Sequence, residues 1–430
     1  MRRLAVPAVL SVTLLACMET GGPTEVMTAR FQVVTSSLGY TAIDLGTLGG
    51  NFSQAIAIND AGQVVGTSRA TGTGAFHAFL WDGTMHDLGT LTGTRSIASG
   101  INAAGHVVGV WGTALFGRPF LWNGTMHDLG TFGFGGVSVS AQDINDSGHV
   151  VGYGGAAAQA VAFLWDGTVA HTLGTLPGRN YSRAWALNDG GQVVGESGFV
   201  SGTDANAFLW DGTMHNLGTL GGAGSIARAI NVAGLVVGES QTASGETHAF
   251  LWDGTMMHDL GTLGGTTSVA RGINDFGVVV GFSTTFSGDS HAFVWDGTMH
   301  DLGTLGGATS FADAINNAGQ VVGSSQTAAG ENHATLWQQL TPVDQLQTCS
   351  VLASSLETNG ALTSGQARSV LNKIGMATAL LNQGKTIPAV NVLEALMNEA
   401  NALALSGVLT AGSASQLTAC VQPVVNAVSN

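Results

Sequence analysis

The sequence has few charged residues, only three cysteines and no long hydrophobic run after its first twenty residues. Charged residues make up 10% of the 430 residues, which argues against a coiled coil or a soluble helical enzyme, while 64 glycines suit many short strands joined by tight turns. The formal net charge of −15 argues against a nucleic-acid partner. Because no later segment is long and apolar enough, we expect no membrane-spanning helix in the body of the protein.

The motifs of common enzyme classes are also missing. The sequence contains no G-x-S-x-G, no H-E-x-x-H, no phosphate-binding loop and no pair of carboxylates beside a lone nucleophile. We therefore expect no enzymatic activity, no cofactor and no metal ion. A glycan hydrolase or lyase is kept as the least favoured alternative, since an absent motif does not exclude catalysis on a versatile fold.

What the sequence does contain is a unit of about 43 residues that recurs seven times between Tyr40 and Trp337. Each unit predicts four short strands, which in the first unit span 53–58, 63–66, 78–81 and 84–88, with Asp82-Gly83 as a two-residue hairpin turn. A tryptophan recurs at Trp81, Trp122, Trp165, Trp210, Trp252, Trp295 and Trp337. An asparagine recurs at Asn59, Asn102, Asn145, Asn188, Asn231, Asn274 and Asn316.

The two ends of the repeat region complement each other. Trp337 is followed by Gln338-Gln339 and no fourth strand, while an isolated strand of the missing kind lies at 40–46. An N-terminal strand that completes the last blade closes WD-type propellers, whereas a solenoid needs polar caps instead. We therefore predict an all-β seven-bladed β-propeller over 39–338, with blade 7 closed by the N-terminal strand 40–46. A solenoid is the alternative.

The repeat resembles the bacterial HAF repeat. The name-giving His-Ala-Phe phrase is present at 77–79, 248–250 and 291–293, while other units depart from it, as at Arg118-Pro119-Phe120. The resemblance covers the repeat region, and it implies an extracellular repeat protein without indicating a ligand.

The N-terminus reads as an export signal. Arg2 and Arg3 precede an apolar run that ends in Leu14-Leu15-Ala16-Cys17, which resembles the lipobox of bacterial lipoproteins. The resemblance implies that the signal peptide 1–16 is removed and that Cys17 is lipidated, with 17–38 as a tether. We expect a cell-envelope protein, sorted to the outer membrane and held by its lipid anchor alone. Ordinary secretion is the alternative.

The composition changes after Thr341 to leucine, alanine and small polar residues with helical spacing. Four helices are predicted at about 343–357, 363–382, 387–405 and 410–428, with Thr363 and Thr410 as N-caps. Short links between them indicate a four-helix bundle over 343–430. The even number of cysteines that remains after Cys17 predicts one disulfide between Cys349 and Cys420. The segment is similar to the FIMAH domain of secreted bacterial proteins, which implies an accessory or attachment module.

A candidate ligand site emerges when the units are compared with one another. Every unit has an alanine four residues before its recurring asparagine, but the next residue varies: Ile56, Ser99, Gln142, Trp185, Arg228, Arg271 and Asp313. Trp185, Arg228, Arg271 and Asp313 come from consecutive units and could converge near the channel mouth, flanked by Tyr181 and Arg183. Aromatic and guanidinium groups together suit recognition of a sugar or a peptide. The alternative is that these residues are solvated or pack between blades.

Charge favours the same face of the predicted disc. We assign the arginines to the variable connections and first strands, while aspartates gather in the opposite turns, so we expect a cationic loop face that attracts carboxylate or sulfate. The arginines of the repeat body are Arg69, Arg95, Arg118, Arg179, Arg183, Arg228 and Arg271.

Two further sets of residues are interpreted from the repeat. Trp111, Phe116, Phe132 and Phe134 could form an exposed patch for a partner, or else fill a local hollow. One histidine per unit lies on the outermost strand, too far from its neighbours to share a metal ion, so we expect His86 to pack opposite Phe79. The recurring tryptophans are likewise expected in the core.

Together these features predict a noncatalytic envelope lipoprotein that binds an extracellular glycan or an envelope protein through its variable loop face. A structural protein that uses the helical bundle for attachment is the alternative.

Overall fold

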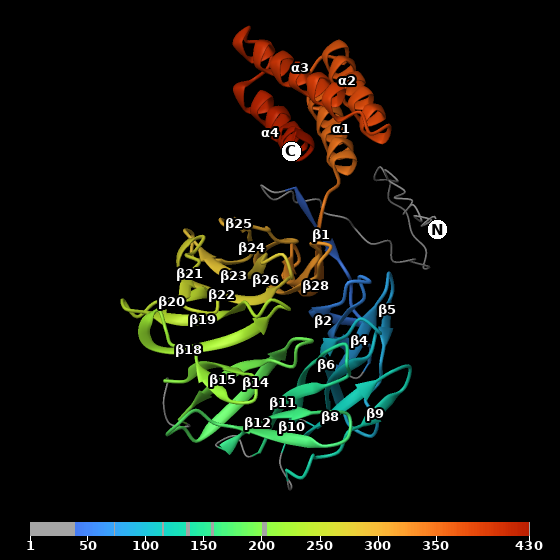
Figure 1. Cartoon of the computed structure of the whole chain (residues 1–430). Coiled ribbons are helices and arrows are strands. Elements are labelled where there is room, and N and C mark those ends of the chain that lie inside the picture. The colour runs from blue at the N-terminus through green and yellow to red at the C-terminus, as the bar shows by residue number, and fades with distance from the viewer. Residues whose placement is uncertain are drawn as a thin grey trace. The chain divides into compact units, whose positions relative to one another are not determined.

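The computed structural model describes residues 39–72, 74–113, 116–134, 138–155, 159–199 and 204–429. The predicted signal peptide 1–16, the tether 17–38 and the lipidation site Cys17 lie outside the described residues. A repetitive β region is followed by four helices, as the sequence predicts (Figure 1). Within the described ranges, no helix is long and apolar enough to cross a membrane.

The β region consists of four-stranded antiparallel units that follow one another along the chain (Figure 1). We number these units one to seven by their first strands. The first strands are β2 (Gly49–Ile58), β6 (Arg95–Ile101), β10 (Val139–Ile144), β14 (Tyr181–Leu187), β18 (Gly221–Ile230), β22 (Gly264–Ile273) and β26 (Gly306–Ile315). The second strands are β3 (Val64–Ala70), β7 (Val107–Gly112), β11 (Val150–Gly154), β15 (Val193–Gly198), β19 (Val236–Thr242), β23 (Val279–Thr285) and β27 (Val321–Thr327).

The third strands end at or just after the recurring tryptophan. They are β4 (Phe76–Trp81), β8 (Gly117–Trp122), β12 (Val161–Trp165), β16 (Asn206–Trp210), β20 (Thr247–Trp252), β24 (Ser290–Trp295) and β28 (Asn332–Gln339). The fourth strands are short: β5 (Met85–Asp87), β9 (Met126–Asp128), β13 (Ala170–Gly174), β17 (Met214–Asn216), β21 (Met257–Asp259) and β25 (Met299–Asp301).

The fourth strand of the seventh unit comes from the other end of the chain. Strand β1 (Tyr40–Asp44) pairs antiparallel with β28, and Ala42 lies opposite Trp337. The Tyr40 hydroxyl donates to Gly319 O at 3.2 Å, and Asp44 forms an ion pair with His333 at 2.7 Å. Trp337 is fully buried in the same cluster as Tyr40 and Ala42. The pairing of the two ends that the sequence predicts is therefore present.

The recurring asparagines link neighbouring units. The side-chain Nδ2 of Asn59 donates to Asn102 O at 3.1 Å, and each later asparagine donates in the same way to the next one. Asn316, the last of them, donates to Asn59 O at 3.1 Å. Because these side chains are 3–5% exposed, each bond satisfies a carbonyl that water hardly reaches.

The hairpin between the third and fourth strands differs from the prediction. Trp81 pairs with Met85, so the turn contains the three residues Asp82, Gly83 and Thr84 rather than two. This shift places His86 opposite Leu80 instead of Phe79. The His86 side chain is 53% exposed and contacts Asp82 at 2.9 Å, so the prediction that it packs opposite Phe79 is wrong.

The aromatic core is formed by phenylalanines more than by tryptophans. Six phenylalanines on the third strands are completely buried: Phe79, Phe120, Phe163, Phe208, Phe250 and Phe293. Among the recurring tryptophans only Trp337, which β1 covers, is fully buried, and the others are half-buried. The short fourth strands cover less of the sheet than expected, which explains why these indoles stay partly open to solvent.

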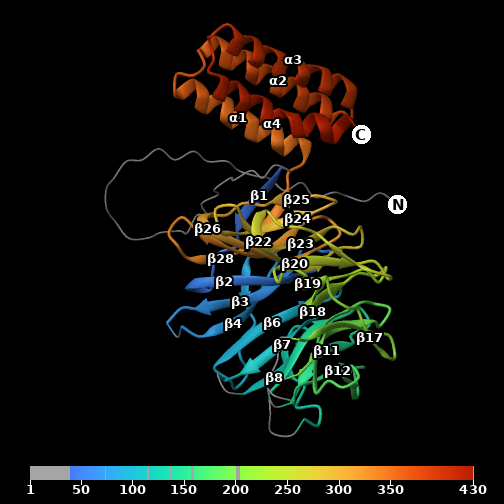
Figure 2. The same cartoon turned by 90° about the vertical axis from the view of Figure 1, so that its left-hand side faces the viewer.

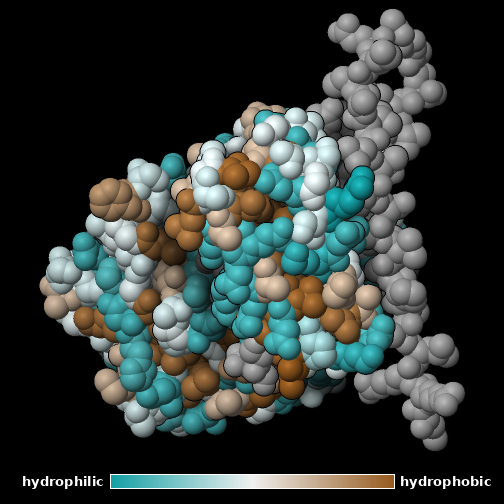
Figure 3. Space-filling model, turned by 90° about the horizontal axis from the view of Figure 1, so that it is seen from above, coloured by the Kyte–Doolittle hydropathy of each residue, from teal (hydrophilic) through white to brown (hydrophobic). Residues whose placement is uncertain are grey.

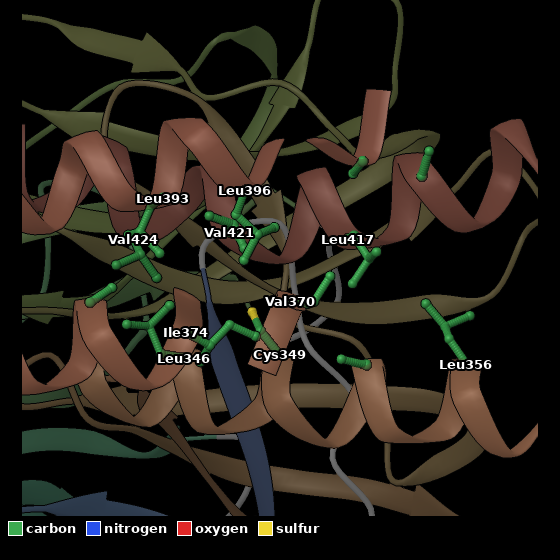
Figure 4. Close-up of a cluster of buried hydrophobic side chains, with 14 of the residues drawn as sticks. Leu346, Cys349, Leu356, Val370, Ile374, Leu393, Leu396, Leu417, Val421 and Val424 are labelled. Carbon is green, nitrogen blue, oxygen red and sulfur yellow. The ribbon is translucent and has the colours of Figure 1, made fainter. Parts of the chain in front are cut away.

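The C-terminal segment forms four helices, which lie side by side in Figure 2: α1 (Pro342–Thr358), α2 (Ser364–Asn382), α3 (Thr386–Leu405) and α4 (Ala411–Ser429). Thr363 caps α2 by accepting from Gln366 N, and the Thr410 hydroxyl accepts from Ser413 N at 3.1 Å, as predicted. Leucine and valine side chains from all four helices point toward one another in the core (Figure 4). The predicted disulfide between Cys349 and Cys420 joins α1 to α4.

Candidate functional site

Each of the seven first strands contains a bulge at the position where the units differ in sequence. The register with the second strand shifts around one extra residue, as between Ala184 and Ala186 in β14. A bulged residue leaves the ladder and can aim its side chain in a new direction. The seven bulged residues are Ile56, Ser99, Gln142, Trp185, Arg228, Arg271 and Asp313.

All seven bulged residues line one cavity of about 580 Å³. A second, smaller cavity of about 240 Å³ is lined by the recurring asparagines and the turn residues that follow them. The two cavities share Ile58, Ile101, Ile230, Ile273, Ile315 and Asp143 in their linings. An apolar collar with a single carboxylate therefore separates the two spaces.

The arginines near the larger cavity are each bound to a carboxylate. Arg228 Nη2 donates to Glu239 Oε1 at 2.6 Å, and Arg183 Nη1 donates to Glu196 Oε1 at 3.2 Å. Arg271 Nη1 donates to Asp313 Oδ1. Burial raises the pKa of Glu196, and the positive charges of Arg183 and Arg228 partly oppose that rise.

These ion pairs bear on the expectation that the loop face is cationic. Three guanidinium charges are matched by three carboxylates within hydrogen-bond distance, so these arginines add no excess of positive charge near the cavity. Among the three pairs, only Arg271 and Asp313 both line it. The arginines also do not keep to first strands and connections, because Arg69 lies in β3 and Arg118 in β8. The expectation of a cationic face that attracts carboxylate or sulfate is therefore not supported at this cavity.

Aromatic rings hold the guanidinium groups in place. Arg228 lies over the Trp185 ring at 5.0 Å, and Trp185 packs edge-on against Tyr153 at 5.7 Å. Arg183 lies over both Tyr153 and Tyr181, at 5.3 and 5.4 Å. Such contacts fix the planar guanidinium so that its remaining N–H groups keep a defined direction.

The structure brings together most of the predicted site. Trp185, Arg228, Arg271 and Asp313 all line the larger cavity. Tyr181 and Arg183 do not line it, and Arg183 is linked to Trp185 only through the Tyr153 ring. Sequence reasoning missed Tyr153, Glu196 and Glu239, which follow the glycine of the Val-Val-Gly phrase in second strands. The same comparison between units would have found them, because this position also varies from unit to unit.

Asp143 is the one carboxylate at a position that otherwise carries alanine or glycine. It follows the bulged Gln142 and accepts hydrogen bonds from Ile144 N at 2.9 Å and Leu187 N at 3.2 Å. Although its side chain reaches the cavity, the surrounding protein raises its pKa to about 7, mainly because burial disfavours the charged form. Asp189 adds a smaller repulsion that raises the pKa further.

This raised pKa predicts a specific pH dependence of stability. The ordinary pKa of an aspartate is about 4, so between about pH 4 and pH 7 the folded protein binds a proton at Asp143 that the unfolded chain has lost. Stability should fall across this window by on the order of 2 kcal/mol, and Asp143→Asn should remove that fall. Urea unfolding at pH 4.5 and 7.5 measures the effect, with Asp146→Asn, an exposed carboxylate of the same unit, as the control. Equal pH dependence in Asp143→Asn and the wild type would contradict this prediction.

The structure does not bring together the predicted partner patch. Trp111 is only 9% exposed and belongs to a buried cluster, while Phe132 and Phe134 pack against Phe163 at 5.0 and 6.0 Å. Phe116 alone among the four is strongly exposed, at 61%. Packing of a local hollow is therefore the better interpretation. On the face seen in Figure 3, hydrophobic residues are likewise scattered among hydrophilic ones.

Comparisons with known proteins identify no family. No protein-family model matches the sequence, and no curated protein matches it. The β-propeller domain of the Trilobed protease from Pyrococcus furiosus is 14% identical over 47% of this chain and 82% of that chain, with a TM-score of 0.30. An Aleuria aurantia lectin mutant in complex with Fucα1-6GlcNAc is 9% identical over 68% and 96%, with a TM-score of 0.36.

A puromycin-hydrolysing peptidase from Mycobacterium tuberculosis is 13% identical over 71% of this chain, with a TM-score of 0.45. The chain covers 55% of that peptidase, so it spans little more than half of its length. The prediction that this protein is not an enzyme is wrong on this comparison, because the similar structures include a peptidase, and we withdraw it. The identities and TM-scores are too low to assign any function to this chain.

Proposed function

We propose that the repeat region is a closed seven-bladed β-propeller and that its central cavity binds a glycan. Three observations support the closed ring. Hydrogen bonds run from each recurring asparagine to the next and from Asn316 back to Asn59. Strand β1 pairs with β28, and β2 also meets β28 through the parallel contact of Phe52 with Asn332. In Figure 1 the units succeed one another around a centre, with β2 beside β28.

The observation that carries the binding proposal is the set of bulged residues around the larger cavity. At one position in each unit the residue varies, so the seven units supply six different residue types there, and all seven residues line the same cavity. Its volume of about 580 Å³ falls within the usual range of ligand pockets. A concave space of this size suits a short oligosaccharide better than the broad surface that a folded protein partner requires.

The chemistry of the wall also fits a neutral sugar. Arg271 and Asp313 both line the cavity and present a donor and an acceptor side by side, an arrangement that can bind vicinal hydroxyl groups. Arg228 lies over the Trp185 ring, so the indole and the guanidinium together form one surface of the cavity against which a sugar can pack. The pairing of charges favours a neutral glycan over an anionic one.

A glycan array tests this proposal. The purified protein should bind a defined group of glycans, and the double variant Arg228→Ala plus Arg271→Ala should lose them. Arg118→Ala is the matched control, because Arg118 also pairs with a carboxylate, at 2.6 Å from Asp128, but does not line the cavity. If no glycan binds, or if the double variant binds as the wild type does, the proposed site is wrong.

We also propose that the protein is an exported envelope lipoprotein of the HAF-repeat kind, with a FIMAH-like helical module. The lipobox-like sequence before Cys17 and the HAF-like repeats support this proposal. Two or three acyl chains on Cys17 would hold the protein on a bilayer, since each buried CH₂ contributes about 0.8 kcal/mol.

Cys17→Ser is expected to abolish lipid attachment. Cells that express the full chain and are fed radiolabelled palmitate should label the wild-type protein in the membrane fraction, whereas the variant should be unlabelled and soluble. Cys349→Ser is the control for loss of a different cysteine, since Cys349 is buried in a disulfide. Equal labelling of wild type and Cys17→Ser would rule out lipidation at this residue.

A further inference from the structure

The wall of the larger cavity is polar in some parts and apolar in others. The second unit of the β region contributes a part of the wall that differs from the parts contributed by all the other units. In every unit, the residue two places before the bulge pairs with the residue after the glycine of the second strand. These cross-strand pairs are Gln54 with Thr67, Ile97 with Val110, Ser140 with Tyr153, Arg183 with Glu196, Ile226 with Glu239, Val269 with Phe282, and Phe311 with Ser324. Only the second unit has two aliphatic residues in this pair.

In units three to six, a large side chain covers at least one member of the pair. Trp185 packs on Tyr153, Arg183 binds Glu196, and Arg228 binds Glu239. Arg271 lies over the Phe282 ring at 4.9 Å. In the second unit the bulged residue is Ser99, whose side chain is too short to cover its neighbours.

The cavity therefore extends outward over the second unit. Among residues at these paired positions in the described chain, only Ile97, Val110 and Ser140 line the cavity. Ile56 of the first unit lines it as well, and these aliphatic side chains remain half-exposed. We call the part of the cavity lined by the aliphatic side chains of Ile56, Ile97 and Val110 the apolar recess.

Polar groups lie directly beside the apolar recess. Ser99, Ser140 and Gln142 all line the same cavity, and Gln142 Nε2 donates to Ser140 Oγ at 2.6 Å. This bond orients the Gln142 side chain and leaves its amide oxygen as an acceptor. Aliphatic walls next to hydroxyl and amide groups match a substituent that contains both a methyl group and a neutral amide.

Building on the glycan-binding function proposed above, we infer that the cavity recognises a sugar with an N-acetyl group, whose methyl enters the apolar recess. The sugar ring would then lie toward Trp185, Arg228 and the Arg271–Asp313 pair, which line the opposite part of the cavity wall. The acetamido N–H and carbonyl would face Gln142 and the two serines. A sugar with a hydroxyl in place of the acetamido group would leave the aliphatic recess filled only with water, which is unfavourable.

Calorimetric titration with two matched neutral probes tests this inference. Tetra-N-acetylchitotetraose and cellotetraose have the same linkage and length, and they differ in the acetamido or hydroxyl group at C2. The wild-type protein should bind the N-acetylated probe at least about tenfold more tightly, which is the lower end of the discrimination that a hydrophobic pocket provides. Ser99→Ile should fill the recess and remove this preference, and isoleucine already occupies the equivalent bulge at Ile56.

The control variant is Ser415→Ile, which makes the same change at an exposed position on α4. It should bind both probes as the wild type does, and thermal unfolding should show that Ser99→Ile remains folded. Equal affinity of the wild type for the two probes, no detectable binding of either, or an equal loss of both in Ser99→Ile would overturn the inference. In those cases the array result with the Arg228 and Arg271 double variant still decides separately whether the cavity binds glycans.

Discussion

Deletion of residues 39–46 is expected to destabilise the β region by at least about 5 kcal/mol. These residues contain β1, which pairs along its whole length with β28 and buries Trp337. The deletion removes the buried side chains of Tyr40 and Ala42 from this cluster and exposes the indole of Trp337 to solvent. Burial of one large apolar side chain contributes about 1.5–3 kcal/mol, and the loss of the β1 hydrogen bonds adds to the exposure of Trp337.

A point substitution separates this effect from the general cost of shortening the chain. Ala42→Asp places a charge opposite Trp337, where Ala42 is 2% exposed, and should destabilise by about 3–5 kcal/mol because the carboxylate would be buried without a partner. Thr41→Asp, on the other face of the same strand, should cost much less. Chemical unfolding followed by tryptophan fluorescence measures both variants. Equal destabilisation at the two positions would contradict the buried pairing of β1.

Trp185→Ala is expected to weaken binding of any glycan identified on the array by at least about 30-fold. Truncation of a central tryptophan in a binding site commonly costs 2 kcal/mol or more, which corresponds to roughly this factor. Trp185 also supports Arg228 through the contact at 5.0 Å, so its removal would loosen a second ligand-binding group. Titration calorimetry measures the affinity.

A graded variant distinguishes loss of the binding surface from loss of the fold. Trp185→Phe keeps an aromatic face and should lose less affinity than Trp185→Ala. Thermal unfolding should show both variants folded, because Trp185 borders a cavity and is only half-buried. If Trp185→Ala binds as tightly as the wild type, the ligand does not contact this wall of the cavity.

Much of the architecture could be predicted because every unit repeats the same pattern of strand and turn residues. The period, the asparagine turns and the stray strand at the N-terminus indicated four-stranded units and the pairing of the two chain ends. The helices and the disulfide followed from spacing, capping residues and an even cysteine count. All of these features depend on local sequence. In the β region, the repeats show the same local sequence several times.

The errors concern details that the repeat pattern does not encode. The Asp-Gly pair suggested a two-residue turn, but Thr84 joins the turn and shifts His86 by one place along the strand. The half-buried tryptophans follow from fourth strands that are shorter than expected. Both depend on hydrogen-bond register, which a propensity for turns does not determine.

Comparison between the units indicates the residues of the candidate site. It does not indicate which of their charges are paired. The variable position next to the recurring alanine indicates Trp185, Arg228, Arg271 and Asp313 from the sequence alone. The sequence could not show that Arg228 meets Glu239 or that Arg271 reaches Asp313 in the next unit. Such pairs depend on the distances between strands and between units, so only the structure shows the net charge around the cavity.

A crystal structure of the protein with a glycan selected on the array tests directly whether the larger cavity is the binding site. We expect electron density for the sugar inside this cavity, in contact with Trp185, Arg228 and Arg271. Density for the sugar on the outer loops or on the helical bundle, with only water in the cavity, would contradict it.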